Sequence, residues 1–352
     1  MRGPSLTVDP RGSLTDVPGI AVGHYQRNGR GWRTGTTAII APAGATAGVD
    51  VRGGGPGTRE TDLLRPENLV QQVHGICLTG GSAYGLAAAN GVMHWLESRS
   101  IGFSVGTQAH QIVPIVPAAV IFDLGRGGDF TRRPDDEFGR RAASRARRAP
   151  EANGAVGAGL GAIAGGLQGG VGSASVRLDS GVVVAALAVV NAAGSLIDPS
   201  TGLPWEHAAH RLRRPTSSER AALRSVYPPT PPATPSSLNT TIGVIATTAR
   251  LSKAECTRVA GVAHDGMARA IRPVHSMFDG DTVFALATGF DELPAAASTG
   301  FRTEGSRPAV LNRILDAAAL CFAAACTQAL LSADSVGGPP SYRDLCPSLF
   351  TA

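Results

Sequence analysis

The sequence changes character abruptly at residue 239, and this junction constrains the fold more than any other feature. Residues 213–238 form a linker rich in proline, serine and threonine, with little to bury. The stretch NTTIGVIATT (239–248) then has the short apolar run of a buried strand. The chain therefore has to fold elements from both sides of an exposed linker into one structure, and we expect residues 1–352 to form a single domain.

Composition places the chain among ordinary globular proteins. It has 352 residues, 43% of them hydrophobic, which is enough for a sizeable core. The opening residues lack the charged-then-apolar pattern of a signal peptide. The most apolar late segment (314–331) is interrupted by polar residues, so we expect a buried helix too short to span a bilayer. These features predict a cytoplasmic protein with no membrane partner.

The charges and cysteines point away from nucleic-acid, metal and cofactor chemistry. The net charge of +5 comes mostly from arginine, and the densest cluster (139–150) contains no aromatic residue for base stacking, so a solvated helix face is expected. The five cysteines lack metal-ligand spacing and are expected to be small core residues. The glycine tract at 153–175 fails the dinucleotide fingerprint, because Ala164 stands where the third glycine belongs. Lys253, the only lysine, starts a helical pattern, a poor place for a Schiff-base amine.

The order of the expected elements indicates an α+β fold. Strands and helices follow one another without strict alternation, which favours helices covering a central pair of sheets. The expected strands cover 35–42, 75–80, 112–122, 181–191, 241–247 and 281–287. The expected helices cover 82–98, 135–148, 252–270 and 308–332.

The junction itself suggests chemistry. A threonine hydroxyl is a weak nucleophile unless a base stands beside it, and one base is the α-amine of the same residue once the preceding peptide bond is cut. An α-amine has an unperturbed pKa of roughly 7.7 to 8.0, so much of it is neutral near physiological pH. The alternative is ordinary turn chemistry, since many strands begin with Asn-Thr. The sequence alone does not rank the adjacent hydroxyls of Thr240 and Thr241.

Two further segments carry candidate site residues. Asp279 and Asp281 precede an apolar strand two positions apart, so in extended backbone their carboxylates share one face and would hold an amine or polarise a hydroxyl. The alternative is a solvated Asp-Gly turn. Asn191 ends another apolar strand, where its side-chain amide would help to form an oxyanion hole. The alternative is a simple strand terminator.

Six segments resemble the DmpA family of L-aminopeptidase/D-amidase-esterases, β-peptidyl aminopeptidases and nylon-oligomer hydrolases. The resemblance covers nearly the whole chain, and the segments together are quite specific. They are LTDVPGIAVGH (14–24), AGVDVRGGGPGTRETDLL (47–64), VHGICLTGGSAYGLAAANGVMHWLE (73–97), IVPIVPAAVIFDL (112–124), NTTIGVIATTARLSKAE (239–255) and FDGDTVFALATG (278–289).

The resemblance implies a precursor that cuts itself between Asn239 and Thr240. The resulting α fragment (1–239) and β fragment (240–352) would stay associated. The implied fold is a four-layer αββα sandwich of the kind shared with ornithine acetyltransferases. Family members commonly assemble as tetramers of the αβ unit, so we expect a homo-oligomer.

The resemblance also assigns roles to the candidate residues. Thr240 aligns with the family's Ser/Thr nucleophile, Asn191 with its oxyanion asparagine, and Asp279 and Asp281 with the acidic or hydroxyl pair near the nucleophile. The implied activity is hydrolysis of short peptides or amino-acid amides through an acyl-enzyme, with no cofactor and no metal. An acyltransferase of the ornithine acetyltransferase type and an unprocessed binding protein of the same fold are the alternatives.

Two departures from the family pattern bear on this expectation. The family often has a tyrosine in an IYDL motif, where this chain has Phe122 in IFDL. It often has a lysine in the glycine tract (GATVGK), where this chain reads GAIAGGLQGG. If those groups assist relatives, this enzyme is slower, differently specific or inactive.

Overall fold

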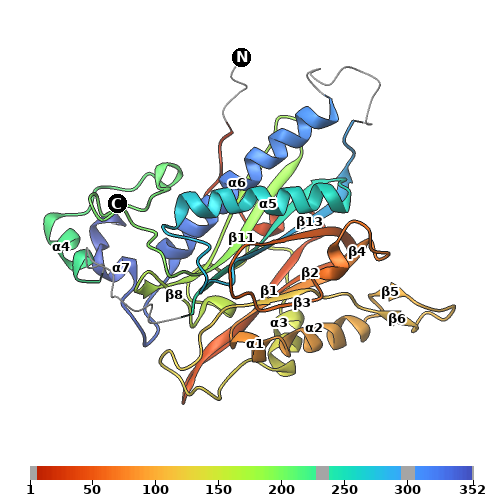
Figure 1. Ribbon diagram of the computed structural model, residues 1–352, viewed down its shortest axis with the longest axis horizontal. Helices are drawn as coiled ribbons and strands as arrows, with labels where there is room; N and C mark the ends of the chain where they lie inside the picture. The colour runs from red at the N-terminus through yellow and green to blue at the C-terminus, as the bar shows by residue number, and fades with distance from the viewer. Residues whose placement is uncertain (1–5, 227–237, 295–305, 351–352) are drawn as a thin grey trace.

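One mixed β-sheet, folded back on itself, organises the molecule. The computed structural model describes residues 6–226, 238–294 and 306–350. In this part of the chain, a nine-stranded sheet has the order β10-β11-β12-β13-β2-β4-β7-β3, with β1 paired to β2. Helices cover its two outer faces (Figure 1). The predicted α+β class and four-layer αββα sandwich are confirmed.

The sheet divides into two layers that share the long strand β2. The first layer contains β10 (Gly170–Arg177), β11 (Val183–Asn191), β12 (Thr240–Ala249), β13 (Thr282–Asp291) and the second half of β2 (Trp32–Val51). The second contains β1 (Ala21–Gly29), the first half of β2, β4 (Gln72–Thr79), β7 (Ala118–Val120) and β3 (Thr58–Arg59). β2 changes layer between Ile40 and Ala45, where its register with β4 shifts. Pro42 and Gly44, the latter at φ +80°, lie in this irregularity and permit the bend.

The two-residue period of the strands sorts side chains into three cores. Between the sheet layers, Ile39 and Ile76 pack with Val244 and Phe284. Neighbouring positions on the same strands point outward, toward helices on either side. Both faces of each layer are therefore buried, which explains why β11 and β12 are apolar without alternation.

Helices α5 (Lys253–Ala270) and α6 (Arg307–Ser332) cover the first layer (Figure 1). α6 lies close to β10, because Gly172 has no side chain: a Cβ there would lie 2.2 Å from the Ala325 carbonyl oxygen and from the Ala329 nitrogen. Within the glycine-dense tract, Gly172 thus permits close packing of the α6 backbone on β10. With 26 residues, α6 is long and apolar enough to cross a membrane, so the expectation that this segment is too short is wrong. However, 78% of its most apolar stretch of 18 residues is buried inside the protein, as predicted for a buried helix.

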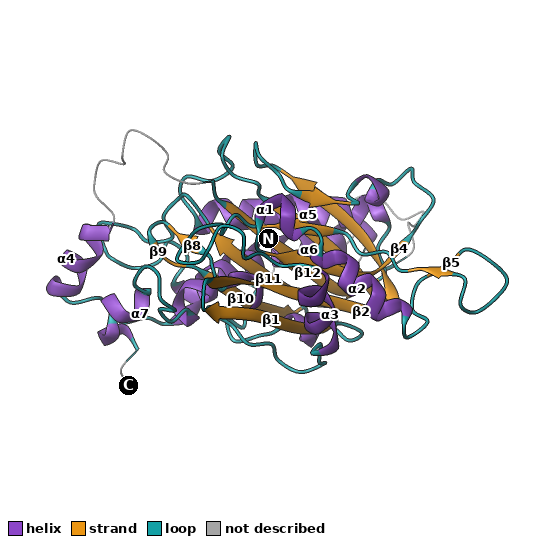
Figure 2. Ribbon diagram, turned by 90° about the horizontal axis from the view of Figure 1, so that it is seen from below, coloured by secondary structure: helices purple, strands orange, loops and turns teal. Residues whose placement is uncertain are grey.

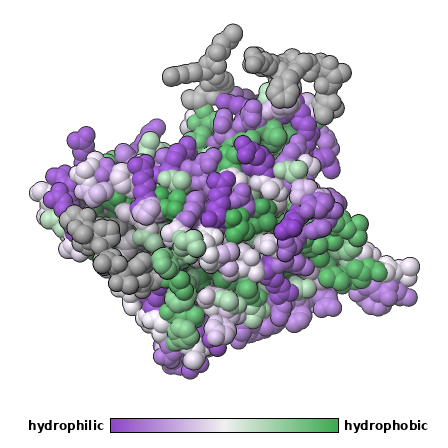
Figure 3. All heavy atoms as spheres, in the orientation of Figure 1, coloured by the Kyte–Doolittle hydropathy of each residue, from purple (hydrophilic) through white to green (hydrophobic). Residues whose placement is uncertain are grey.

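The opposite face is covered by α2 (Ala88–Glu97) and α3 (Asp136–Ser144), with the short α1 (Ser82–Gly85) beside them (Figure 2). Val92 and Leu96 of α2 and Phe138 of α3 pack on Ile40 and Cys77 of the second layer. The hairpin of β5 (Phe103–Ser104) and β6 (Ile112–Val113) projects from this side. Hydrophobic residues gather at the base of that projection in the space-filling view (Figure 3).

Two expected elements are shorter or broken. The predicted strand 112–122 is only β6 and β7, because Pro114 and Pro117 remove backbone donors between them. The predicted helix 82–98 is broken between α1 and α2, where the amides of Leu86 and Ala87 bond three residues back instead of four.

The predicted linker at 213–238 is partly helical. α4 (Ser217–Val226) forms within it because the prolines leave ten residues of helix formers uninterrupted. Leu223 of α4 is buried, and its Glu219 accepts a hydrogen bond of 2.9 Å from the Ser348 amide. Residues 227–237 of the predicted linker lie outside the described residues.

Short elements complete the chain. They are the strands β8 (Ile163–Ala164) and β9 (Leu167–Gln168), the helix α7 (Tyr342–Leu345), and the 3₁₀ turns η1 (Leu14–Asp16), η2 (Asp62–Leu64), η3 (Gly157–Gly159), η4 (Ala208–His210) and η5 (Pro347–Leu349).

Lys253 has a structural role at the start of α5. Its ammonium group donates hydrogen bonds of 3.0 Å to the carbonyls of Leu63, Asn68 and Val70, and the residue is only 3% exposed. The lysine therefore ties the loop after η2 to the first helical layer.

We expect Lys253→Met to lower the free energy of unfolding by about 1.5–3 kcal/mol, because three backbone carbonyls beside the buried lysine lose a charged donor. Urea unfolding at pH 7 measures the change. Arg258→Met, on an exposed position of the same helix, is the matched control and should change stability by less than about 0.5 kcal/mol. Equal effects of the two substitutions would contradict this role.

Candidate active site

The predicted junction lies at the start of β12, inside the first sheet layer. Strand pairing sets Thr240 opposite Asn191 of β11, and an isolated bridge sets Asn239 beside Asp279. Asn239 and Thr240 are each 5% exposed. Pairing of segments far apart in sequence thus brings four of the predicted site residues, Asn191, Asn239, Thr240 and Asp279, to one end of the layer.

The peptide bond between Asn239 and Thr240 is held on both sides. The Asn239 amide donates to the Phe278 carbonyl at 3.2 Å. The Asn239 carbonyl oxygen accepts the Gly280 amide at 3.2 Å and the Thr240 hydroxyl at 2.5 Å. A backbone N–H aimed at a carbonyl oxygen can stabilise the negative charge that forms there during nucleophilic attack.

Gly280, which the sequence analysis did not single out, is required by this geometry. A Cβ at position 280 would lie 2.9 Å from the Thr240 Oγ1 atom, so any side chain would crowd the hydroxyl. The only signal in the sequence is a glycine between the two predicted aspartates. The Gly280 amide thus donates to the junction carbonyl, and the missing side chain leaves room for the Thr240 hydroxyl.

The two adjacent threonines have different surroundings. Ile242 and Val244, which share the strand face of Thr240, belong to the core between the sheet layers. Thr241 lies on the opposite face with Ile245, toward the helices. Its hydroxyl oxygen is buried and has no hydrogen-bond partner among the described residues, whereas the Thr240 hydroxyl contacts the junction carbonyl. Only the Thr240 hydroxyl is thus in contact with the predicted cleavage site.

The predicted carboxylates lie beside the junction and organise its backbone. Asp281 accepts the Thr241 amide at 2.7 Å and the Nδ1 atom of His275 at 2.8 Å. Asp279 accepts the Ser276 amide at 2.7 Å. Burial raises the pKa of Asp279. These hydrogen bonds fix the turn that presents Gly280, and a direct role of the pair toward the Thr240 amine or hydroxyl stays a prediction.

Arg126 is a further site residue that the sequence analysis missed. Its guanidinium donates to Asn191 Oδ1 at 2.5 Å, to the Leu238 carbonyl at 2.6 Å and to Asn239 Oδ1 at 3.0 Å. Burial lowers the pKa of Arg126 to about 10, and the nearby Asp123 carboxylate opposes this shift, so the group is cationic at neutral pH. The available signal was an arginine between two glycines, directly after IFDL.

Asn191 connects Arg126 to the sheet. Its Oδ1 accepts Arg126 and the Ile163 amide, the latter at 3.0 Å, while its Nδ2 donates to the Phe122 carbonyl at 3.2 Å. The side chain is fully buried beside Thr240. To stabilise an oxyanion, Asn191 Nδ2 has to release the Phe122 carbonyl and donate to the substrate instead. That role stays a prediction. The Phe122 ring lies 5.6 Å from the Arg126 guanidinium.

Neither the histidines nor the cysteines suggest a second chemistry. In the described ranges, no group of three or more His, Cys, Asp or Glu side chains is arranged to hold a metal ion. All five cysteines are free and buried, which confirms them as core residues.

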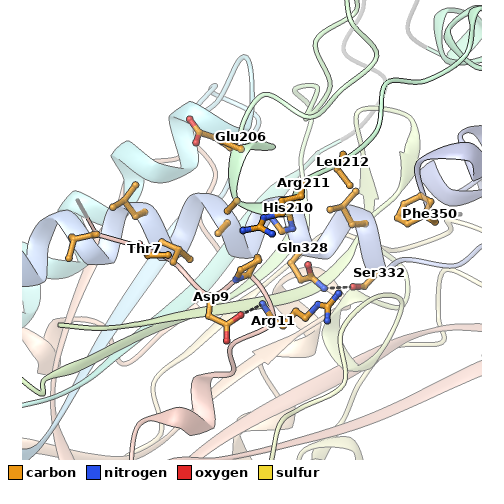
Figure 4. A pocket seen from close by; sticks show the side chains of 18 of the residues that line it. Thr7, Asp9, Arg11, Glu206, His210, Arg211, Leu212, Gln328, Ser332 and Phe350 are labelled. Carbon is orange, nitrogen blue, oxygen red and sulfur yellow. Dashed lines mark hydrogen bonds between the residues drawn. The ribbon is translucent and has the colours of Figure 1, made fainter. Parts of the chain in front are cut away.

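One cavity in the described part of the chain, seen in Figure 4, has a volume of about 980 Å³. It is bounded by the N-terminal segment around Asp9, the loop around His210 and the face of α6 that carries Gln328. None of the junction residues lines it. This cavity therefore does not mark the candidate active site, which is recognised by its hydrogen bonds.

Comparison with known proteins identifies the family of this chain. The model of Peptidase family S58 matches residues 12–343, and the chain belongs to that family. An "uncharacterized aminopeptidase" of Mycobacterium tuberculosis is 50% identical over 347 residues, covering 96% of this chain and 99% of that protein. A 6-aminohexanoate-oligomer endohydrolase of Kocuria sp. is 34% identical over 290 residues, covering 79% of this chain and 76% of that protein.

Solved structures agree. A beta-aminopeptidase of Burkholderia sp. superposes with a TM-score of 0.70 at 26% identity, covering 100% of this chain and 98% of that one. The L-aminopeptidase D-Ala-esterase/amidase of Ochrobactrum anthropi, described as a variant of the Ntn hydrolase fold, shares the fold with a TM-score of 0.67 at 20% identity, covering 94% and 88%. The family resemblance seen in the sequence is confirmed. The chain is a peptidase or amidohydrolase, and the non-enzymatic binding protein is not retained as an alternative.

Asp123, beneath the Arg126 loop, gives the site a pH-dependent contribution to stability. Burial raises its pKa to about 6, although the Gly81 amide and the Arg126 charge oppose the shift. The folded chain therefore holds this proton more tightly than the unfolded chain. The contribution is fully present below the unfolded pKa of about 3.9 and is lost as the pH rises through about 6.

We expect the free energy of unfolding of the wild type to fall by up to about 3 kcal/mol between pH 4 and pH 7 as Asp123 loses its proton, because its pKa is raised by about two pKa units. Asp123→Asn removes the titration and should flatten the profile by that amount. Urea unfolding of both proteins across this range measures it. Parallel profiles for the two proteins would contradict the assignment.

Proposed function

We propose that this member of Peptidase family S58 matures by cutting its own Asn239–Thr240 bond and then hydrolyses amide bonds of short peptides or amino-acid amides. The observation that carries the proposal is the Thr240 hydroxyl on the carbonyl of that same bond, at 2.5 Å. The names of the relatives, aminopeptidases and an amide-oligomer hydrolase, support the reaction class.

Maturation needs only groups already at the junction. Thr240 Oγ attacks the Asn239 carbonyl carbon, and the negative oxygen is stabilised by the Gly280 N–H. The C–N bond then breaks, with the hydroxyl proton passing to the departing Thr240 nitrogen. This leaves an ester between Asn239 and the Thr240 side chain. Water hydrolyses the ester to an Asn239 carboxylate and restores the hydroxyl.

Turnover repeats these steps on an external amide. The new Thr240 amine takes the proton of its own hydroxyl, directly or through a water, and Oγ attacks the substrate carbonyl. The leaving amine carries away a proton, and water releases the acyl group from Thr240. Asn191 and the Gly280 amide stabilise the oxyanion. The Phe278 carbonyl, which accepts the Asn239 amide at 3.2 Å, offers an acceptor for the substrate's α-amine.

The fragments 1–239 and 240–352 are expected to stay together after the cut. β12 begins the second fragment and is paired along its length with β11 of the first. Its other neighbour, β13, pairs with β2 of the first fragment. Separation would break both ladders and expose the shared cores. Assembly into tetramers and a cytoplasmic location remain expectations.

We expect Thr240→Ala to abolish the cut and to lower amide hydrolysis by more than about a thousandfold, because no other group supplies the nucleophile. Gel analysis of the chain over time and release of p-nitroaniline from amino-acid p-nitroanilides measure the two effects. A Thr240→Ala protein that still matured and hydrolysed amides would refute the proposal. Adding an amine acceptor to the same assay distinguishes hydrolysis from acyl transfer.

Thr241→Val is the matched control. It removes the neighbouring hydroxyl, which is buried and has no partner in the part of the chain that the structure describes, and keeps the shape of the side chain. We expect this variant to mature and turn over at rates within a few fold of wild type. Arrest of Thr241→Val, with Thr240→Ala still active, would move the nucleophile to Thr241.

A further inference from the structure

Arg126 binds the acyl side of the bond that is expected to be cut. Two of its three oxygen partners, the Leu238 carbonyl and Asn239 Oδ1, belong to the end of the fragment that precedes the cut. The third, Asn191 Oδ1, lies on β11 and stays in place. Once the end of that fragment leaves, the guanidinium retains Asn191 and presents donors to whatever replaces Asn239.

The replacement is chemically defined. In maturation, the intermediate is the acyl group of Asn239 esterified to Thr240 Oγ. In turnover, it is the acyl group of the substrate esterified to the same Oγ. Both esters have the same attachment and the same oxyanion donor, the Gly280 amide. The side chain of the substrate's acyl residue therefore occupies the region now held by the Asn239 side chain.

We propose that Arg126 determines specificity by selecting substrates whose acyl residue carries a side-chain oxygen at the position of Asn239 Oδ1, as asparagine and aspartate do. An apolar residue of the same shape leaves a partly desolvated, charged donor without an acceptor, which is costly. A lysine or arginine side chain would meet a like charge. The inference rests on the proposed function, because it concerns the same acyl-enzyme.

The test compares the p-nitroanilides of asparagine and leucine, whose side chains have nearly the same shape. For the matured wild type, we expect kcat/KM for the asparagine anilide to exceed that for the leucine anilide by roughly 10- to 100-fold, the usual effect of a charged hydrogen bond. The aspartate anilide should also exceed the leucine anilide. A wild-type preference for leucine over asparagine would overturn the inference without any variant.

Variants connect the preference to the guanidinium. Arg126→Met should bring the ratio of kcat/KM for the asparagine and leucine anilides to within about threefold of one. Arg126→Lys keeps the positive charge but lacks the planar, forked guanidinium, so its ratio should lie between those of wild type and Arg126→Met. Arg140→Met, at an exposed arginine of α3, is the matched control and should keep the wild-type ratio. An unchanged ratio in Arg126→Lys would contradict the assignment even if Arg126→Met failed to fold or mature.

Failure of the role of Arg126 and failure of the proposed function give different results. Two fragments and hydrolysis of the anilides with no side-chain preference would reject the role of Arg126 and leave the proposed function standing. A chain that stays intact and hydrolyses none of the anilides would reject the proposed function itself.

Discussion

The hydrogen bonds on the Asn239 carbonyl are the interaction on which the rest of the site depends. They require β12 to begin between β11 and the turn before β13, so that the Gly280 amide and the Thr240 hydroxyl reach one oxygen. That placement requires the first sheet layer to be complete, with helices on one side and the second layer on the other. In the proposed reaction, the fold thus holds one peptide bond beside the Thr240 nucleophile and the Gly280 donor.

Charge is distributed on both sides of this bond. The Asp279 and Asp281 carboxylates hold the turn that carries Gly280, while the Arg126 guanidinium holds the acyl side through Asn191 and Asn239. Because the charges on the two sides have opposite signs, the buried junction carries no large uncompensated charge. In the proposed reaction, they also orient the substrate, with its acyl group toward the Arg126 cation.

Much of this arrangement could be predicted from the sequence, because it depends on local patterns and on a specific family resemblance. The apolar runs of β11, β12 and β13 placed Asn191, Thr240 and Asp279 at or beside strand ends. Arg126 could not be found this way, because its partner Asn191 lies 65 positions away and no periodicity connects a glycine-flanked loop to a strand end. The two faces of β12, which separate Thr240 from Thr241, became assignable only once the cores on each side were known.

The central claim is that the chain cuts itself before Thr240, and the most direct test is the intact mass of the purified, denatured protein, followed by N-terminal sequencing. The account predicts two fragments, the smaller beginning at Thr240. A single full-length chain that persists for days, or a fragment that begins at Thr241, would contradict it.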